Sequence, residues 1–391
     1  MRTTVGIVGG GPAGLLLARL LHQAGVDCVL LECRDRAYVE QRQRAGILEQ
    51  GTIDALRACG AGERMDREGL PHDGVELRFD GRGTRIDFPG LTGRQVMVYA
   101  QTEVVKDLIA LHLAEGPQLL FEAQVTAVEG ADTDSPVIRF THSGREQTLH
   151  CDYVVGCDGF HGVTRHAIPD GVRQTFERVY PYSWLGILAD VPPSSDELIY
   201  AHHERGFALL SMRSPSVSRL YLQVPNGTDP ASWSDEQIWG ELDARFALAD
   251  GSFKLARGPI TSKSVTPMRS FVAEPMRYGR VLLAGDAAHI VPPTGAKGLN
   301  LAVADVVVLA RAFAHLHTTG SAELLDAYSD TCLRRVWRAE HFSYFMTTTL
   351  HPDPEQSPFE TRLQISQLDR IASSQHAAAE VAENYTGLPI G

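Results

Sequence analysis

Three short motifs typical of nucleotide binding follow one another along the chain. The first, formed by Gly9, Gly11 and Gly14, has G-x-G-x-x-G spacing. These glycines permit a tight turn, the approach of a pyrophosphate to the backbone and close packing of a helix on a strand. The second motif spans residues 157–159 and the third residues 285–289. The ordered set predicts one dinucleotide, FAD, held at its phosphates and again at its sugar-like linker.

Acidic residues that follow apolar runs are suited to the hydroxyl groups of this dinucleotide. Glu32 follows the second expected strand, where a carboxylate can bind ribose hydroxyls. Asp286 follows the apolar run 281–284, and its carboxylate suits a polyol such as the ribityl chain. Asp158 follows the apolar run 153–155 and is assigned to FAD as well. The alternative for Asp286 is a helix cap.

A helix terminus and two basic residues offer sites for further negative charge. Gly298, Leu299 and Asn300 begin a long helix, whose positive end would face the flavin pyrimidine and favour its reduction. His161 and Arg165 lie just beyond the second motif and are candidates for transient contact with the phosphates of a pyridine nucleotide. Ordinary surface charge is the alternative for both.

Residues 207–213 and 219–224 alternate polar with apolar side chains across a turn-rich segment, which predicts an antiparallel hairpin. Ser211 and Arg213 are two positions apart and share one face, with Tyr221 on the next strand. An arginine fork beside two hydroxyls can receive a carboxylate, and a solvated sheet face is the alternative. The opposite face is expected to carry Ala208, Leu210, Met212, Leu220, Leu222 and Val224.

The elements that position these residues predict an α/β fold. A strand at 5–8, a helix at about 13–24 and a strand at 28–31 form a βαβ unit, which implies a parallel sheet. We expect three parts. They are a Rossmann-like FAD domain (1–174), an antiparallel substrate sheet ending in the third-motif strand (175–289), and a flavin-contacting loop with a C-terminal helical part (290–391).

Composition limits the possible partners and location. The net charge is −12 over 391 residues, which argues against nucleic acid or an anionic membrane as the main partner. The six cysteines are scattered without C-x-x-C spacing, which is typical of a reduced cytoplasm. No metal site is expected. Aromatic residues between about 320 and 350 are candidates for a homodimer surface, with an ordinary core as the alternative.

Longer stretches resemble one family of flavoenzymes from one end of the chain to the other. They are residues 44–51, 98–103, 176–181, 197–201, 285–300 and 383–385. The chain is similar to the class A flavoprotein monooxygenases, and within them to the hydroxylases of 4-hydroxybenzoate. These stretches are more specific than the flavin motifs, which many oxidoreductases share.

The resemblance implies a reaction and a substrate orientation. NAD(P)H would reduce FAD, dioxygen would be taken up as a flavin C4a-hydroperoxide, and one oxygen atom would enter the ring ortho to the phenol. The product would be 3,4-dihydroxybenzoate. Arg213, Ser211 and Tyr221 would bind the carboxylate. The family also implies a flavin that swings between two positions, with Arg44, Gln101 and Arg219 as its rim contacts.

At the phenol end of the substrate, the resemblance implies a chain of proton carriers. Tyr200 would contact the phenol oxygen, Tyr385 would continue the chain, and His72 would reach solvent. The Pro293 carbonyl is an additional expected contact to the phenol. Asn300 is placed with this catalytic group as well as with FAD.

The residues after Glu32 bear on the choice of nicotinamide nucleotide. Family members that prefer NADPH often have an arginine directly after the acid, whereas this chain has Cys33. Arg34, Arg36, Tyr38 and Arg42 could still contact a 2′-phosphate, and Asp35 would oppose it. His161 and Arg269 complete the expected nucleotide contacts. NADPH is favoured, and use of both nucleotides stays open.

Other functions remain open at the level of sequence. A related hydroxylase would act on another phenolic acid. A flavin oxidase or dehydrogenase on the same fold would incorporate no oxygen and would not need Tyr200 and Tyr385. A non-enzymatic binding protein would purify without colour.

Overall fold

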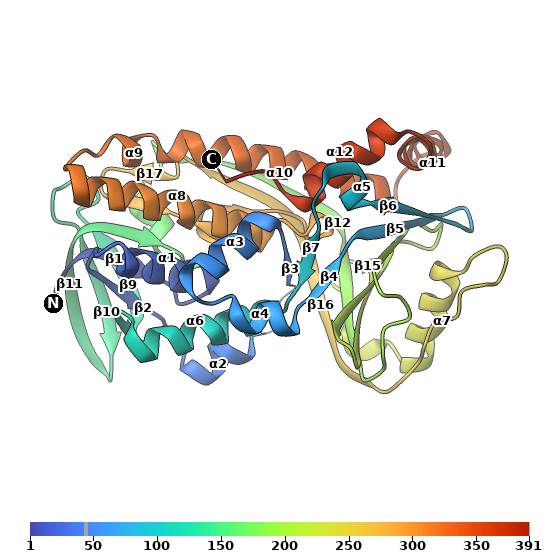
Figure 1. The fold of residues 1–391 in the computed structure, drawn as a ribbon, viewed down its shortest axis with the longest axis horizontal. Helices are drawn as coiled ribbons and strands as arrows, with labels where there is room; N and C mark the ends of the chain where they lie inside the picture. Colours follow the sequence, from blue (N-terminus) through green and yellow to red (C-terminus); the bar gives the residue numbers. More distant parts are fainter. Residues whose placement is uncertain (43–45, 391) are drawn as a thin grey trace.

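The computed structural model describes residues 1–42 and 46–390 and shows an α/β molecule with two large sheets and a layer of long helices (Figure 1). The first sheet lies at the N-terminal end of the elongated molecule, and the second lies at the other end. The long helices α8 (Gly298–Thr319) and α10 (Tyr328–Leu350) run along one side. The predicted fold class is confirmed.

The first sheet has the strand order β17-β18-β11-β1-β2-β8, with β10 and β9 attached to β11. Its strands are β1 (Arg2–Val8), β2 (Cys28–Leu31), β8 (Gln118–Leu120), β9 (Gln124–Glu129), β10 (Val137–His142), β11 (Arg145–Gly156), β17 (Arg277–Tyr278) and β18 (Val281–Leu283). β1 pairs in parallel with both β2 and β11. β1 begins earlier than the apolar run suggested, because Arg2 and Thr3 pair with His150 and Cys151.

The helix after the glycine motif, α1 (Pro12–Gln23), is buried between the first sheet and its neighbours α6 (Gln101–Glu115) and α8. A proline at its start fits the first turn, where no backbone donor is needed. Ala24 ends the helix, and Gly25 follows with a φ of +73°, a conformation that favours glycine. The predicted βαβ unit is therefore present, with shifts of one residue at the helix ends.

The second sheet has the order β19-β16-β12-β15-β14-β13-β5-β6. Its strands are β5 (Gly74–Phe79), β6 (Arg82–Asp87), β12 (Gln174–Ala189), β13 (Leu198–Ala201), β14 (Ala208–Ser214), β15 (Val217–Pro225), β16 (Ile260–Glu274) and β19 (His289–Ile290). The predicted hairpin is β14 and β15. The sheet is not wholly antiparallel, because β13 pairs in parallel with β5. β5 and β6 come from the segment 1–174, so the sheets do not follow the expected sequence boundaries.

The hairpin departs from the predicted alternation at one residue. The pairing of β14 with β15 shifts between Met212 and Ser214, as in a β-bulge, which re-aims side chains. Met212 belongs to the core cluster of Leu209 and Tyr200, so the expectation that it lies with Leu210 on the opposite face was wrong. The remaining apolar face packs under α7 (Asp235–Phe246).

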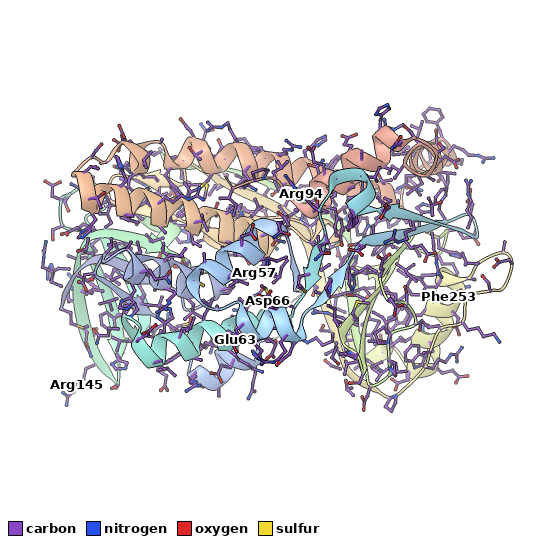
Figure 2. All side chains as sticks on the ribbon, viewed as in Figure 1. Arg57, Glu63, Asp66, Arg94, Arg145 and Phe253 are labelled. Atoms are coloured by element: carbon purple, nitrogen blue, oxygen red, sulfur yellow. The ribbon has the colours of Figure 1, made fainter. Side chains whose placement is uncertain are left out.

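Short elements connect the two large sheets. A small sheet of β3 (Ile47–Leu48), β7 (Val96–Val98) and β4 (Leu70–His72) lies between them (Figure 1). The short helices are α2 (Arg36–Gln41), α3 (Gln50–Cys59), α4 (Glu63–Glu68), α5 (Phe88–Thr92) and α9 (Glu323–Asp326). Figure 2 shows Arg57 beside Asp66, and this ion pair of 2.8 Å joins α3 to α4.

The C-terminal part is helical, as expected. α8 is long and apolar enough to cross a membrane, but 61% of its apolar window is buried inside the protein, so it is a core helix here. α10 carries the aromatic residues noted in the sequence. α11 (Pro358–Ser373) begins with a capping box formed by Ser357 and Glu360. α12 (Gln375–Thr386) then brings Tyr385 toward the second sheet, where it joins the core cluster of Tyr200.

Candidate active site

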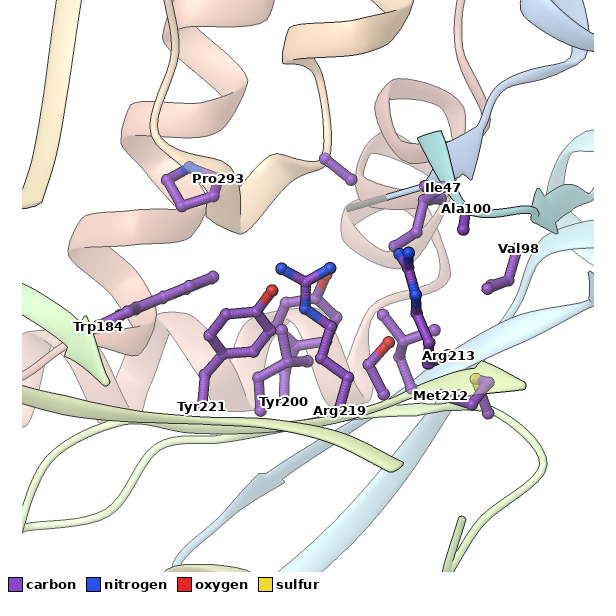
Figure 3. Close-up of a pocket in the computed structure, with 15 residues that line it drawn as sticks. Ile47, Val98, Ala100, Trp184, Tyr200, Met212, Arg213, Arg219, Tyr221 and Pro293 are labelled. Atoms are coloured by element: carbon purple, nitrogen blue, oxygen red, sulfur yellow. The ribbon is translucent and has the colours of Figure 1, made fainter. Parts of the chain in front are cut away.

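A pocket opens between the polar face of the β14–β15 hairpin and the loops that precede α6 and α8 (Figure 3). Arg213, Arg219 and Tyr221 rise from the hairpin into it, and Pro293 lies across from them. The lining residues are Gly46, Ile47, Val98, Ala100, Trp184, Leu198, Tyr200, Leu209, Ser211, Met212, Arg213, Arg219, Tyr221, Pro293 and Ala296. The structure thus gathers the expected substrate-binding residues in one cavity.

Two guanidinium groups give one end of this pocket a positive charge. Arg213 donates from Nη2 to the Thr102 hydroxyl at 2.6 Å, which ties it to the start of α6. Burial, and then the charge of Arg219, lower the pKa of Arg213. Arg219 lies over the Tyr221 ring at 5.3 Å. A carboxylate entering here would relieve the repulsion between the two cations and accept their hydrogen bonds.

A pair of buried phenols stands in the second sheet's core beside the pocket. The hydroxyls of Tyr200 on β13 and Tyr385 on α12 are 2.7 Å apart. Burial, and then the other phenol, raise the pKa of Tyr200 well above its ordinary value. Burial also raises the pKa of Tyr385. Both groups are therefore neutral at physiological pH, and each can donate one proton while accepting another.

His72 does not reach solvent in this structure, so that part of the expected relay was wrong for this conformation. Its side chain at the end of β4 is 1% exposed, and neither ring nitrogen has a hydrogen-bond partner among the described residues. Burial lowers its pKa. The backbone links His72 to the phenol pair only indirectly. The carbonyl of the neighbouring Asp73 accepts a hydrogen bond from the Phe88 amide. The Phe88 ring in turn stacks on Tyr385, with the ring centres 5.1 Å apart.

The Asn300 side chain has a structural role here, whereas we expected a catalytic one. Its oxygen accepts from the Glu49 amide and the Thr52 hydroxyl, at 3.0 and 2.7 Å. Its nitrogen donates to the carbonyls of Ile47 and Ala296, both at 2.9 Å. The side chain therefore fixes β3 and α3 against the start of α8, and its amide has no further donor to offer.

A buried ion pair that sequence reasoning missed lies behind the same helix terminus. Lys297 donates to Glu49 at 2.5 Å and to the Tyr385 carbonyl at 3.2 Å. Both charged groups are nearly inaccessible. Burial lowers the pKa of Lys297 despite Glu49. The partners are too far apart in sequence for any spacing pattern to join them.

The glycine motif has the geometry of a dinucleotide site. Gly9 has a φ of +106°, and a Cβ there would lie 2.3 Å from the Cys157 carbonyl. A Cβ on Gly14 would lie 2.0 Å from the Gly9 carbonyl, whereas nothing lies within 4 Å of one on Gly11. No side chain caps α1, so its first amides are open to a pyrophosphate at Gly11. Glu32 faces this loop and accepts from the Gly10 amide at 2.6 Å.

The second motif is built into the structure more deeply than expected. One Asp158 oxygen accepts from the amide and hydroxyl of Thr164, at 2.9 and 2.8 Å, while the other has no partner among the described residues. Arg165 is buried and donates to the carbonyls of Ala287 and Phe160. Arg165 therefore holds the second motif against the third, and its transient contact with a nucleotide stays a prediction.

The third motif is held by a pair that the sequence did not reveal. Asp286 is exposed just after β18, as a ribityl ligand requires. Asp305 of α8 accepts from the Gly285 amide at 2.9 Å and contacts His289 at 2.7 Å. Burial lowers the pKa of His289, but the Asp305 charge outweighs it and raises the pKa overall. Gly298 and Leu299 begin α8 without a side-chain cap, which leaves its positive end open to the flavin pyrimidine.

The expected contacts to a second nucleotide fall into two groups. Arg34 lies over the Tyr38 ring at 5.0 Å, and Asp35 caps α2 by accepting from the Tyr38 amide. Arg42 ends α2. In the other group, Arg269 lies 4.7 Å from the centre of the Phe160 ring, and the ring of the exposed His161 contacts Phe160 as well. Gln101 is the first residue of α6. Arg44 lies outside the described residues.

The fold and this site define the chain as a FAD-binding protein, and comparisons with known proteins agree. The family model described as "FAD binding domain" matches residues 2–343. The chain is 47% identical over 390 residues to p-hydroxybenzoate hydroxylase of Acinetobacter baylyi, covering 100% of this chain and 96% of that protein. It therefore belongs to the family of FAD-dependent aromatic monooxygenases, and FAD is its cofactor.

More distant proteins share this fold. The chain is 29% identical over 346 residues to 12-dehydrotetracycline 5-monooxygenase/anhydrotetracycline 6-monooxygenase of Streptomyces rimosus, covering 84% of this chain and 66% of that protein. The crystal structure of p-nitrophenol 4-monooxygenase PnpA from Pseudomonas putida superposes with a TM-score of 0.83 at 20% identity, over 99% of each chain. This structural likeness supports the fold alone.

Proposed function

We propose that the enzyme hydroxylates 4-hydroxybenzoate at C3. The balanced reaction is 4-hydroxybenzoate + NAD(P)H + H⁺ + O₂ → 3,4-dihydroxybenzoate + NAD(P)⁺ + H₂O. Bound FAD would supply electron transfer from the nucleotide and activation of dioxygen. The observation that carries the substrate assignment is one pocket lined by Arg213, Ser211 and Tyr200 together. The identity to p-hydroxybenzoate hydroxylase over the whole length supports it.

Substrate orientation follows from the charges in the pocket. The guanidinium of Arg213 and the hydroxyls of Ser211 and Tyr221 bind the carboxylate, because a fork of donors matches two carboxylate oxygens. The phenol end of the ring then points toward Tyr200. Pro293 lies in the loop across the pocket, and its carbonyl can accept a hydrogen bond from the phenol before ionisation.

The buried phenol pair activates the ring. A free phenol has a pKa near 10, so roughly one molecule in a thousand is ionised at neutral pH. The phenolate is the better nucleophile toward an electrophilic oxygen. Tyr200 donates to the phenolate oxygen and passes the released proton to Tyr385, 2.7 Å away. His72 can accept that proton only when water reaches it, because its buried ring has no hydrogen-bond partner within residues 1–42 and 46–390 in this conformation.

The pocket is suited to keep water from the reacting centre. Its walls are largely apolar, with Trp184, Leu198, Leu209 and Met212 between the polar groups. Exclusion of water matters because a wet site would release hydrogen peroxide in place of hydroxylated product.

NADPH is the preferred reductant in our proposal, and NADH is a usable second one. Arg34, Tyr38 and Arg42 can contact the 2′-phosphate, while His161 and Arg269 contact the other phosphates. Asp35 repels the 2′-phosphate less than its charge alone suggests, because its carboxylate accepts a hydrogen bond from the Tyr38 amide at the start of α2. Comparison of kcat/KM for the two nucleotides tests this choice, and a strong preference for NADH would contradict it.

We also infer a cytoplasmic homodimer with the domain division 1–174, 175–289 and 290–391. An exposed patch formed by Phe176, Val179, Trp337 and Tyr344 supports the dimer, and the scattered free cysteines support the location. The division describes chain segments, since β5 and β6 cross into the second sheet.

Product analysis with labelled dioxygen tests the function most directly. Purified enzyme is incubated with 4-hydroxybenzoate, NADPH and ¹⁸O₂, and the product is identified by mass spectrometry. We expect 3,4-dihydroxybenzoate with one labelled oxygen at C3. An oxidase or dehydrogenase would give no labelled phenol, and activity confined to another phenolic acid would disprove the substrate assignment.

A further inference from the structure

A buried histidine lies behind the pocket wall, outside the groups assigned to the reaction. His351 follows the last turn of α10, is 1% exposed, and accepts a hydrogen bond at Nε2 from the Trp184 indole at 2.7 Å. Trp184 lines the pocket (Figure 3). An indole nitrogen can only donate, so His351 Nε2 must be the acceptor.

This contact determines the protonation of the ring. Since Nε2 accepts, the single proton of the neutral imidazole sits on Nδ1, which lies 2.8 Å from the Thr347 carbonyl and donates to it. Burial lowers the pKa of His351 to about 3. Protonation would place a second hydrogen at Nε2, facing the indole donor, so the neutral tautomer and the bond to Trp184 require each other.

The surrounding rings hold the imidazole in one plane. Tyr182 stacks on it at 4.9 Å with an interplanar angle of 7°, and Phe207 lies 4.1 Å away. On its other side, Trp184 contacts the Tyr221 ring at 4.8 Å. Rotation of the indole would therefore displace Tyr221, which is assigned to the substrate carboxylate.

The same network reaches a second segment of the pocket wall. The Thr347 hydroxyl is bonded to the Thr294 hydroxyl at 2.9 Å, and both residues are fully buried. Thr294 follows Pro293, which lines the pocket. Thr347 of α10 thus connects His351, and with it Trp184, to the loop that carries Pro293.

We propose that His351 is a positioning residue of the substrate pocket, which fixes the Trp184 indole and through it the carboxylate end of the site. It is not among the residues that line the pocket. The proposal rests on the proposed function for its kinetic consequence, whereas the hydrogen bond itself can be tested without turnover.

The kinetic test compares His351→Leu, which removes the acceptor, with His351→Gln, which offers an amide oxygen near the position of Nε2. We expect His351→Leu to raise the KM for 4-hydroxybenzoate about tenfold, or about 1.4 kcal/mol, and to increase the hydrogen peroxide released per NADPH consumed. His351→Gln should restore much of both properties. Trp184→Phe keeps a ring but removes the donor, so adding His351→Leu to it should raise KM little further.

The matched control is His112→Leu, since His112 is also a buried histidine bonded to a carbonyl, that of Leu15, but lies in the FAD domain. It should lower stability and leave the KM unchanged. An equal KM increase in this control, or additive effects of Trp184→Phe and His351→Leu, would overturn the proposal.

Indole ¹⁵N–¹H spectra supply the test that needs no substrate. The chain has four tryptophans, and Trp184→Phe identifies the signal of Trp184. We expect that signal to shift upfield in His351→Leu and to keep its position in His112→Leu. An unchanged signal in His351→Leu would overturn the positioning role even if 4-hydroxybenzoate is hydroxylated. Failure of wild-type enzyme to hydroxylate it, with the shift present, would disprove the proposed function alone.

Discussion

Among single residues, Arg213 carries the proposed orientation of the substrate. Its guanidinium is half-buried, bonded to Thr102 and close to Arg219. Two cations in one pocket form a receptor that favours an anion and disfavours a neutral ring. A carboxylate is the group that satisfies both charge and geometry.

Replacing Arg213 with alanine should raise the KM for 4-hydroxybenzoate about 100-fold, because loss of a charge-assisted bond in a desolvated site costs about 3 kcal/mol. Flavin should stay bound. Steady-state kinetics and flavin absorbance measure the two effects. Arg139→Ala is the control, because Arg139 pairs with Glu129 on an exposed hairpin of the first sheet. An unchanged KM in Arg213→Ala would remove the proposed orientation.

Replacing Tyr200 with phenylalanine should leave substrate affinity nearly intact and slow hydroxylation about tenfold or more, since the phenolate loses a donor worth about 1.5 kcal/mol or more. Rapid-reaction kinetics and the optical signal of bound phenolate measure both. Tyr328→Phe also deletes a buried hydroxyl, one bonded to the Leu283 carbonyl, and should not change the ionisation. A normal rate with full coupling in Tyr200→Phe would eliminate the relay.

In the turn from β1 into α1, two glycines have different roles. Gly14 has no room for a methyl group because the Gly9 carbonyl occupies the space. Gly11 has that room in the protein alone. One position therefore serves folding, and the other serves the approach of a ligand.

Gly14→Ala and Gly11→Ala should consequently differ in the protein stripped of flavin. We expect Gly14→Ala to lower the melting temperature of the stripped protein, because forcing a methyl group into packed backbone costs about 1–3 kcal/mol. Gly11→Ala should melt like the wild type but bind FAD more weakly. Thermal melting and fluorescence titration with FAD measure these effects. Equal FAD affinity in Gly11→Ala and the wild type would refute the pyrophosphate site.

The packing of α10 on β16 has a pH-dependent element. Burial raises the pKa of Glu340 to about 7. Hydrogen bonds with Ser270 and the Phe271 amide, and the charge of His289, lower this pKa by smaller amounts. Because the folded pKa exceeds the unfolded value, this carboxyl contributes stability below about pH 4.5 that is lost as pH rises through about 7.

Glu340→Gln should therefore be more stable than the wild type at pH 8, by up to about 3 kcal/mol, and similar to it near pH 5. Denaturant unfolding at several pH values measures the difference. The control is Glu380→Gln, which replaces an exposed residue on α12 and should leave the stability unchanged at both pH values. A Glu340→Gln variant that loses stability at pH 8 would show that the ionised carboxylate is favourable there.

At the scale of the whole molecule, an exposed aromatic patch lies where the first half of β12 meets α10. It consists of Phe176, Val179, Trp337 and Tyr344, each more than 40% exposed. Phe176 and Trp337 are in edge-to-face contact at 5.4 Å. Exposed aromatic clusters mark protein interfaces, which supports a homodimer through this face.

Val179→Glu should place a charge in this interface and shift the protein from dimer to monomer. Light scattering coupled to gel filtration measures the mass at several concentrations. Leu113→Glu is the control, since Leu113 is equally solvent-accessible but lies on α6. A wild-type protein that is monomeric at every concentration would disprove the dimer.

Local patterns in the sequence were sufficient to predict the elements that carry both halves of the site. The βαβ start and the β14–β15 hairpin follow from patterns within a few residues, because period-2 and helical periodicities report which face is buried. Arg213 and Tyr221 could be placed in one receptor on this ground. Tyr200 and Tyr385 were identified through resemblance alone, since nothing in local spacing joins them.

The contacts between segments that are distant in sequence became apparent in the folded chain. It brought β5 and β6 into the second sheet, placed Met212 in the core cluster of Tyr200, and buried His72 without a hydrogen-bond partner among the described residues. It also paired Trp184 with His351. The physical reason is that burial and hydrogen-bond satisfaction depend on neighbours in space, and residues distant in sequence leave no periodic signal of their contact.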